Sequence, residues 1–160
     1  MATGREVFVF WQPNEKKTGN NNIKILRVDK CQINKNHPLY KTIDQFCFYS
    51  KNLYNAANYI LRQEFIKENK YSNYNEMDRR MRQTPQYKQL MSQASQCTLQ
   101  VLDRNWKSFF VAIKDWSKNK EKYLGMPKLP KYKKKNGRFP WFLKNNQTYI
   151  KDGRLYFRLK

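Results

Sequence analysis

The chain is organised around the segment Thr42-Ile-Asp-Gln-Phe-Cys-Phe-Tyr-Ser-Lys-Asn-Leu-Tyr-Asn-Ala-Ala-Asn-Tyr-Ile-Leu-Arg-Gln-Glu-Phe-Ile-Lys67. Its apolar residues recur mostly at steps of three and four, which is typical of one stripe of an amphipathic helix. The stripe consists of Ile43, Phe46, Cys47, Leu53, Tyr54, Ala57, Ile60, Leu61 and Phe65. Pro38 comes just before the segment, where helices tolerate proline best. The pattern predicts a helix over residues 42–67 that buries one face.

Two further helices are expected downstream. A short one over residues 75–83 should stop at Thr84-Pro85, because proline disfavours helical backbone in the residue before it. A second long helix should run from residue 85 to about residue 120. Its apolar stripe is Leu90, Ala94, Cys97, Val101, Leu102, Trp106, Phe109, Phe110, Ile113 and Trp116. The helices can bury these stripes as a small bundle, so the aromatic residues of the stripe are expected in the core rather than on a base-stacking surface.

Strand-like sequence lies on both sides of the helical block. Residues 5–11 and 23–33 are rich in β-branched and aromatic residues and could form a hairpin around the polar turn at residues 13–22. After the helices, the extended segments are residues 138–143, 148–151 and 154–159, with Asp152-Gly153 as a two-residue hairpin signal. This order predicts an α+β chain in which a β-barrel is interrupted by a helical module.

The charge of the chain points to a polyanion as its partner. Lys and Arg number 33 against 12 Asp and Glu, a formal charge of +21. Nucleic acid is the first candidate and an anionic membrane surface the second. No stretch approaches the roughly 20 apolar residues of a membrane-spanning helix, and the first residues lack the apolar core of a secretory signal. Residues 121–160 hold 12 basic and 2 acidic side chains, so the strongest binding surface is expected there.

No catalytic or metal site is expected in this chain. Cys31, Cys47 and Cys97 are far apart and match no zinc pattern, so they are interpreted as core fillers in a reducing cytosol. His37 is the only histidine, which leaves no Ser-His-Asp arrangement to consider, and the glycines are too dispersed for a phosphate-binding loop. The carboxylates of the helices, such as Asp103, are expected on their polar faces.

Four motifs in order resemble the TnpB family, the transposon-encoded relatives of compact type V CRISPR effectors. Ser50-Lys-Asn-Leu-Tyr-Asn-Ala-Ala-Asn58 is similar to the first recognition helix of that family, and Leu99-Gln-Val-Leu-Asp-Arg-Asn-Trp-Lys-Ser-Phe-Phe110 to its second long helix. Gly125-Met-Pro-Lys-Leu-Pro-Lys-Tyr-Lys133 resembles its glycine-proline-basic connection. Asn146-Gln-Thr-Tyr-Ile-Lys-Asp-Gly-Arg-Leu155 resembles its next hairpin. Together the motifs cover essentially the whole chain.

The resemblance implies an OB-like wedge barrel interrupted by a helical recognition lobe. Residues 1–39 would supply the first wedge strands, residues 40–122 the recognition lobe, and residues 123–160 the returning wedge strands of an incomplete barrel. In the family this region holds guide RNA and contacts the duplex motif that flanks the DNA target. The family's RuvC-like nuclease, with its divalent metal, and its zinc ribbon would begin beyond Lys160. A fragment, a split gene product or an engineered half is therefore expected, located in a prokaryotic cytosol or nucleoid.

The expected partners are guide RNA, target double-stranded DNA and, as a further candidate, the C-terminal nuclease half. Basic groups with interleaved aromatics, which neutralise phosphates and stack on unpaired bases, are the first set of candidate contacts. It comprises Lys128, Lys131, Tyr132, Lys133, Lys134, Lys135, Arg138, Trp141, Lys144 and Asn145.

A second set lies in the helical block. Arg79, Arg80 and Arg82 could position phosphates, or could form local pairs with Glu76 and Asp78. By the resemblance, Tyr74, Gln96 and the strand around residues 143–145 would read the flanking motif, since glutamine can bond an adenine edge. Ser92 and Gln93 stand where the family can have a basic or aromatic residue, which leaves the preferred motif open.

Two other functions fit the same sequence. One is a nuclease-free regulator that uses RNA to occupy promoters. The other is a generic basic RNA-binding protein, which predicts heterogeneous RNA and a steep salt dependence without a flanking motif.

Overall fold

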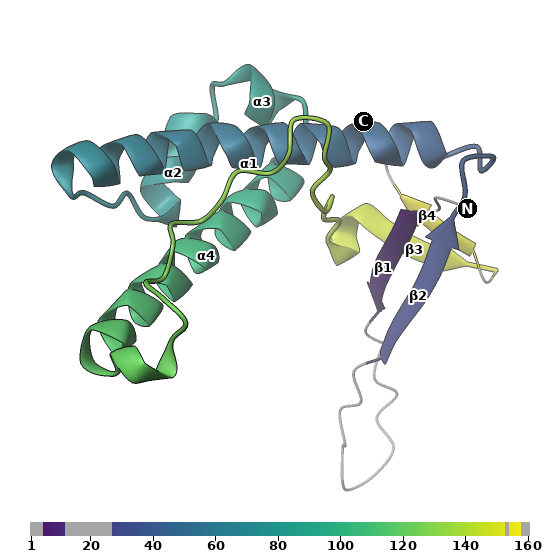
Figure 1. Ribbon diagram of the computed structural model, residues 1–160. Helices are drawn as coiled ribbons and strands as arrows, with labels where there is room; N and C mark the ends of the chain where they lie inside the picture. The colour runs from purple at the N-terminus through teal and green to yellow at the C-terminus, as the bar shows by residue number, and fades with distance from the viewer. Residues whose placement is uncertain (1–4, 12–26, 153, 158–160) are drawn as a thin grey trace, which may run out of the picture. The chain divides into compact units, whose positions relative to one another are not determined.

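The computed structural model describes residues 5–11, 27–152 and 154–157 (Figure 1). The described chain is α+β and mostly helical. It divides into two compact units, residues 1–42 and residues 43–160, so the segment after residue 122 belongs to the same unit as the helices. Within the described part, no helix combines the length and hydrophobicity that crossing a membrane requires.

The first unit contains an antiparallel hairpin. Strand β1 (Arg5–Trp11) pairs with β2 (Arg27–Ile33), from Arg5 opposite Ile33 to Trp11 opposite Arg27. This confirms the predicted pairing of the two strand-like segments. The predicted turn at residues 13–22 and the predicted strand residues 23–26 lie outside the described residues.

The second unit is built on α1 (Tyr40–Glu68), which confirms the helix expected over residues 42–67. Helix α2 (Tyr74–Met81) confirms the short helix and begins with a capping box. The Asn73 side chain accepts a hydrogen bond from the backbone amide of Glu76, and the Glu76 carboxylate accepts one from the backbone amide of Asn73. Thr84 caps α3 (Pro85–Lys88), a single turn that starts with the proline expected to end α2.

The prediction of one continuous helix from residue 85 is wrong at its beginning. Helix α4 spans Ser92–Lys118, and Met91 before it is extended, with φ −66° and ψ 139°. A continuous helix would bond the Tyr87 carbonyl to the amide of Met91. That carbonyl instead accepts from the Leu90 amide at 3.2 Å and from the Ser95 hydroxyl at 3.0 Å. The helix can be interrupted here because the Leu90 amide and the Ser95 hydroxyl both donate to the buried Tyr87 carbonyl.

The core lies between α1, α2 and α4 (Figure 1). Trp106 of α4 is fully buried, and its ring contacts those of Phe65 and Tyr71 at centroid distances of 5.5 and 5.8 Å. The expectation that the aromatic stripe of α4 is core is confirmed for Trp106 and Phe109, whereas Phe110 and Trp116 are half-buried. Burial of a large aromatic side chain stabilises a fold by about 2–3 kcal/mol, so this cluster is a main source of stability.

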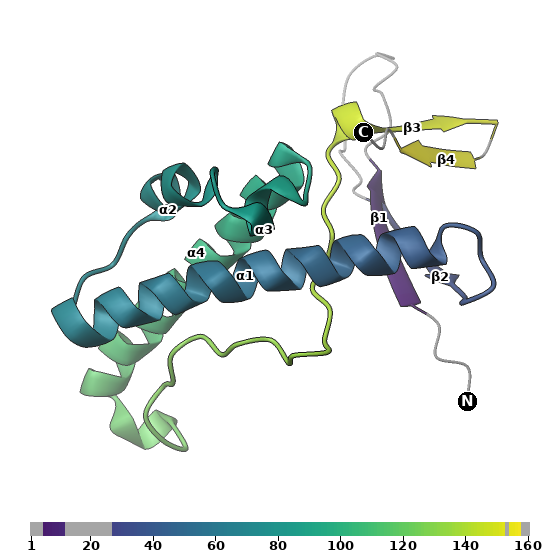
Figure 2. The ribbon, with the colours of Figure 1, turned by 90° about the horizontal axis from the view of Figure 1, so that it is seen from above.

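Residues 123–144, called the strap here, return from α4 as an extended chain alongside α1 (Figures 1 and 2). The strand expected over residues 138–143 is not formed, because this stretch has no regular secondary structure and pairs with no strand among the described residues. A short 3₁₀ helix, η2 (Asn145–Gln147), then leads into a hairpin.

The C-terminal hairpin confirms the two-residue turn signal. Strand β3 (Thr148–Lys151) pairs with β4 (Arg154–Phe157), with Lys151 opposite Arg154. Asp152 has a φ of 50°, the left-handed conformation that such a turn requires. The described strands therefore form two separate two-stranded sheets and do not by themselves close a barrel.

Candidate nucleic-acid interface

The strap is fastened to one stripe of α1 by side chains that recur at steps of three, four and seven residues. Because each residue turns a helix by about 100°, these positions fall within about 60° around its axis. Their contacts reach strap residues 68 or more positions away in the sequence. The α1 side chains are Asp44, Lys51, Asn55, Asn58 and Arg62.

Two asparagines make the most complete of these contacts. The side-chain amide of Asn55 donates to the backbone carbonyl of Lys133 at 2.9 Å and accepts from the backbone amide of Lys133 at 2.8 Å. A neighbouring β-strand would make the same pair of hydrogen bonds to Lys133. Asn58, which is fully buried, donates to the Pro130 carbonyl at 3.0 Å and accepts from the Trp106 indole at 3.0 Å. These hydrogen bonds replace sheet pairing for the strap backbone.

Lys51 of α1 contacts the strap with a charged side chain that is buried. The Lys51 ammonium donates to the Lys135 carbonyl at 2.8 Å and lies 4.1 Å from the centre of the Phe48 ring. Burial, followed by the charge of Arg138, lowers the pKa of Lys51. Arg138 itself binds the Asp44 carboxylate with two nitrogens, at 3.1 and 2.6 Å. The strap is therefore held by backbone and ionic contacts from Pro130 to Arg138.

This fastening divides the basic residues predicted from the sequence into two groups. The Lys133 ammonium lies over the rings of Tyr54 and Phe139, at 4.8 and 5.0 Å, and Arg138 is half-buried against Asp44. Both of these cations have structural partners. The exposed members of the predicted set are Lys128, Lys131, Tyr132, Lys134, Lys135 and Lys144.

Trp141 lies in the hydrophobic contact between the strap and α1. Its ring stacks on Phe46 at 4.6 Å with an interplanar angle of 15°, and meets the edge of Phe157 of β4 at 6.0 Å. Its buried indole N–H makes no hydrogen bond within the described residues. This position holds the C-terminal hairpin against α1, while the side chain of Asn145, a further predicted contact, lies outside the described residues.

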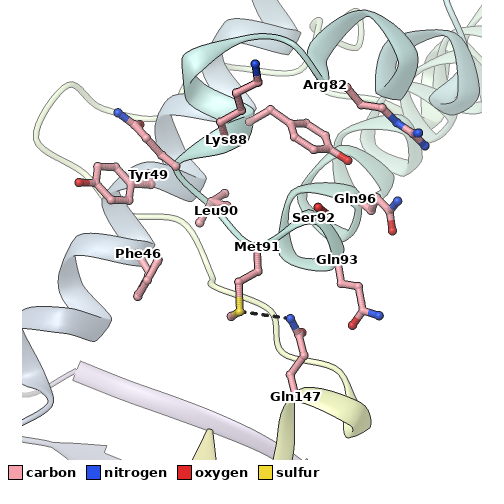
Figure 3. Close-up of a pocket in the computed structure, with 12 residues that line it drawn as sticks. Phe46, Tyr49, Arg82, Lys88, Leu90, Met91, Ser92, Gln93, Gln96 and Gln147 are labelled. Carbon is pink, nitrogen blue, oxygen red and sulfur yellow. Dashed lines mark hydrogen bonds between the residues drawn. The ribbon is translucent and has the colours of Figure 1, made fainter. Parts of the chain in front are cut away.

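A groove of about 830 Å³ opens beside the start of α4 (Figure 3). Gln93 and Gln96 line it from α4, Arg82 from the end of α2, and Gln147 from η2. The buried amide oxygen of Gln93 makes no hydrogen bond within the described residues, whereas the Gln147 amide donates to the Met91 sulfur at 3.4 Å. The groove therefore presents side-chain amides, which can both donate to and accept from a base edge.

A stripe of polar residues runs along α4 from this groove to a second, separate hollow. Gln93, Gln96, Gln100, Arg104 and Lys107 fall within about 80° around the axis. A second hollow of about 560 Å³ is lined by Gln100, Arg104 and Lys107, and by residues 73–75 at the start of α2. Of the predicted motif readers, Gln96 therefore lines the first hollow and Tyr74 the second.

The third predicted reader, a strand around residues 143–145, is wrong, because residues 145–147 form η2. The groove receives Gln147 from that element, a residue that the sequence analysis missed.

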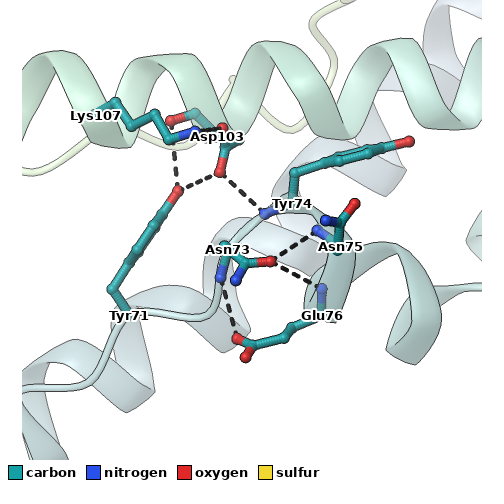
Figure 4. A network of polar contacts seen from close by, with 7 residues as sticks. All are labelled: Tyr71, Asn73, Tyr74, Asn75, Glu76, Asp103 and Lys107. Carbon is teal, nitrogen blue, oxygen red and sulfur yellow. Dashed lines mark hydrogen bonds and ion pairs between the residues drawn. The ribbon is translucent and has the colours of Figure 1, made fainter.

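Asp103 fixes the start of α2 beside the second hollow (Figure 4). Its carboxylate accepts from the Tyr71 hydroxyl at 2.7 Å and the Tyr74 amide at 3.0 Å, and pairs with Lys107 at 2.7 Å. Burial, followed by the hydrogen bond to Asp103 and the charge of that carboxylate, raises the pKa of Tyr71. Asp103 is thus a structural acceptor that places Tyr74.

The three arginines of the α2 region have different surroundings. Arg79 is exposed, while Arg80 pairs with Glu64, not with the Glu76 considered from the sequence. Arg82 binds Asp78 with two nitrogens, at 2.9 and 2.6 Å, as the local-pair alternative predicts. The exposed guanidinium of Arg82 still lines the groove.

No protein-family model and no curated protein matches this chain. The side chains of the strap and of α4 therefore carry the functional argument. Within the described residues, no group of three or more His, Cys, Asp or Glu side chains is placed to hold a metal ion.

A pH-dependent contribution to stability is expected from Glu64. Burial alone raises its pKa, but hydrogen bonds from Arg80 and Ser72 outweigh that effect and hold the pKa below its usual value. A lowered pKa in the folded state stabilises the fold above pH about 4.5 and loses that effect as the pH falls through the folded value. Glu64→Gln should therefore cost up to about 1 kcal/mol at pH 7, since Arg80 is well exposed, and progressively less below pH 4. Urea unfolding at several pH values measures this; a cost that stays constant with pH contradicts it.

Proposed function

We propose that this chain is the nucleic-acid-binding portion of an RNA-guided DNA endonuclease of the TnpB type. It would hold the scaffold of a guide RNA and read the duplex motif that flanks the target. Base pairing between guide and target would read the remaining sequence. The chain itself would supply binding and no catalytic residue.

The observation that carries this proposal is the display of lysines on the strap. Lys128, Lys131, Lys134 and Lys135 are exposed, while the backbone that bears them is hydrogen-bonded to α1. A flexible basic loop loses conformational entropy when it becomes ordered on RNA. The strap is already ordered by its contacts with α1, so binding RNA removes less conformational entropy from it. A fixed row of cations suits a folded RNA, whose phosphates have fixed positions.

The groove at the start of α4 supports the second part of the proposal. Its glutamine amides are groups that can recognise a base edge in the major groove, and Arg82 beside them can contact a phosphate or a guanine. The resemblance assigns Gln96 the same role. The two hairpins would belong to a wedge barrel that other strands complete.

The test is to sequence the RNA that copurifies with this chain from cells that also carry its native neighbouring DNA. One discrete structured transcript from the flanking element is expected. A broad mixture of cellular RNA would favour the generic RNA-binding function and contradict the guide-specific one. The reading frame beyond Lys160 would separate a nuclease from a nuclease-free regulator, because the family's RuvC-like nuclease uses three carboxylates that a regulator would lack.

Gln96→Ala is expected to change which flanking motif is preferred. Loss of a bidentate contact to one base costs about 1–3 kcal/mol at that position and little elsewhere. Enrichment of a randomised duplex library on the guide-loaded protein measures the preference. Gln100→Ala, on the same face of α4, is the matched control and should leave the position read by Gln96 unchanged. Uniform weakening across the library in the Gln96 variant would contradict the role.

A further inference from the structure

A third hollow lies between the strap and the second half of α4, away from the glutamine groove. Its volume is about 410 Å³, within the range of about 300–1,000 Å³ typical of small-ligand pockets. The wall on α4 includes Asn105, Ser108 and Phe109. The strap contributes Lys128, Lys131 and Tyr132. The hollow thus combines an aromatic surface, hydrogen-bonding side chains and several cations.

Tyr132 is held in place before any ligand arrives. The residue is 44% exposed, although Tyr54 and Phe109, which also line the hollow, are buried. The Arg62 guanidinium lies 5.2 Å from the centre of the Tyr132 ring. Arg62 also donates to the Pro130 carbonyl at 3.0 Å, two residues before the tyrosine. An ordered ring that remains exposed is suited to stacking.

The polar groups around Tyr132 match the other parts of a nucleotide. Lys128 and Lys131 are exposed at the rim, where they can neutralise a phosphate. Asn105 donates to the Tyr54 hydroxyl at 3.0 Å, which orients its amide on the α4 wall, and Ser108 lies one turn along the same helix. A paired base cannot offer its face, because the duplex stack covers it, whereas an unpaired base can.

We propose that this hollow binds a single unpaired nucleotide, with its base stacked on Tyr132 and its phosphate between Lys128 and Lys131. This inference rests on the proposed nucleic-acid function and adds a strand-specific site to it. An unpaired nucleotide can come from a loop or bulge of RNA or from a displaced DNA strand. The chemistry that the hollow recognises is shared by the two sources.

The experiment measures binding of labelled probes to the full chain by fluorescence anisotropy. The probes are a short oligo(U) RNA, an oligo(T) DNA of equal length and a blunt RNA duplex. Tyr132→Ala should weaken binding of a single strand about 5- to 100-fold and change duplex binding less than twofold. Tyr132→Phe should retain single-strand binding, because the ring is kept. Whichever single strand shows the larger loss identifies the source.

Two further variants keep the test independent of folding. Tyr59→Ala removes an exposed tyrosine of α1 and should change binding of neither kind of probe. Ser108→Met narrows the hollow from the α4 side without altering Tyr132, and should weaken single-strand binding alone. Equal losses for single strand and duplex in the Tyr132→Ala protein, or no loss for either, would overturn the site while leaving the proposed function intact. A wild-type chain that binds no probe would overturn both.

Discussion

Replacing Asn58 with alanine is expected to lower the free energy of unfolding by about 2–4 kcal/mol, because the buried Trp106 indole loses its partner and the Pro130 carbonyl keeps only Arg62 as a donor. Asn58 is fully buried and joins the Trp106 indole to the Pro130 carbonyl. Alanine leaves the indole N–H without an acceptor, and the space it leaves is too enclosed for full compensation. The thermal midpoint should fall by about 5–15 °C, and urea unfolding followed by circular dichroism measures the free energy.

Asn52→Ala is the matched control for this prediction. Asn52 lies on the same helix, so the two substitutions share the same change in helix propensity. Unlike Asn58, it is only half-buried. Its cost should stay within about 0.5 kcal/mol. A double-mutant cycle with Trp106→Phe isolates the bridge, because the two substitutions together should cost clearly less than the sum of their separate costs. Additive costs would mean that the indole contact contributes nothing.

Replacing Lys131, Lys134 and Lys135 together with glutamine is expected to weaken RNA binding by about 100-fold at 0.1 M salt. All three side chains are exposed, and the strap that bears them is fixed by α1. The slope of log affinity against log salt should fall by about 2, since each phosphate contact releases counterions. The loss should be similar for all RNA sequences, because a phosphate contact does not read a base.

The matched control for the triple variant removes the same charge elsewhere. Lys67, Lys70 and Lys118 are exposed on or beside the long helices, and their replacement with glutamine lowers the net charge by the same amount. If binding depends on net charge alone, both triple variants will lose the same slope, and the strap will have no special role. Lys133→Gln forms a further comparison. Its ammonium lies over two rings, so its replacement should lower the free energy of unfolding. The salt dependence of RNA binding should change little.

The elements that follow from local pattern were predictable from the sequence. The stripe that begins at Ile43 is a short-range signal and specified α1 to within two residues at its start, and Asp152-Gly153 specified the C-terminal turn. The break at Met91 was not predictable. It depends on a hydrogen bond from Ser95 to Tyr87 that competes with continued helix, and both conformations fit the same apolar stripe.

At the candidate site, too, the sequence predicted the general feature and the tertiary structure decided the individual residues. Composition and charge predicted a binding surface on a basic, aromatic segment near the C-terminus. They could not separate the exposed Lys134 and Lys135 from the structural Lys133, because the backbone alone determines which side chain faces α1.

The residues that fasten the strap were missed, although one signal for them exists in the sequence. Asn55, Asn58 and Arg62 recur at helical spacing beside the apolar stripe of α1, where a solvent-facing surface would not need asparagine. Nothing local says what they bind. Their partners lie 68 to 78 residues further along the chain, and hydrogen bonds at such separations are fixed only when the core brings α1 and the strap together. The sequence therefore determined α1, α2, the C-terminal turn and the sign of the surface charge, and the tertiary structure alone decided which cations that surface presents.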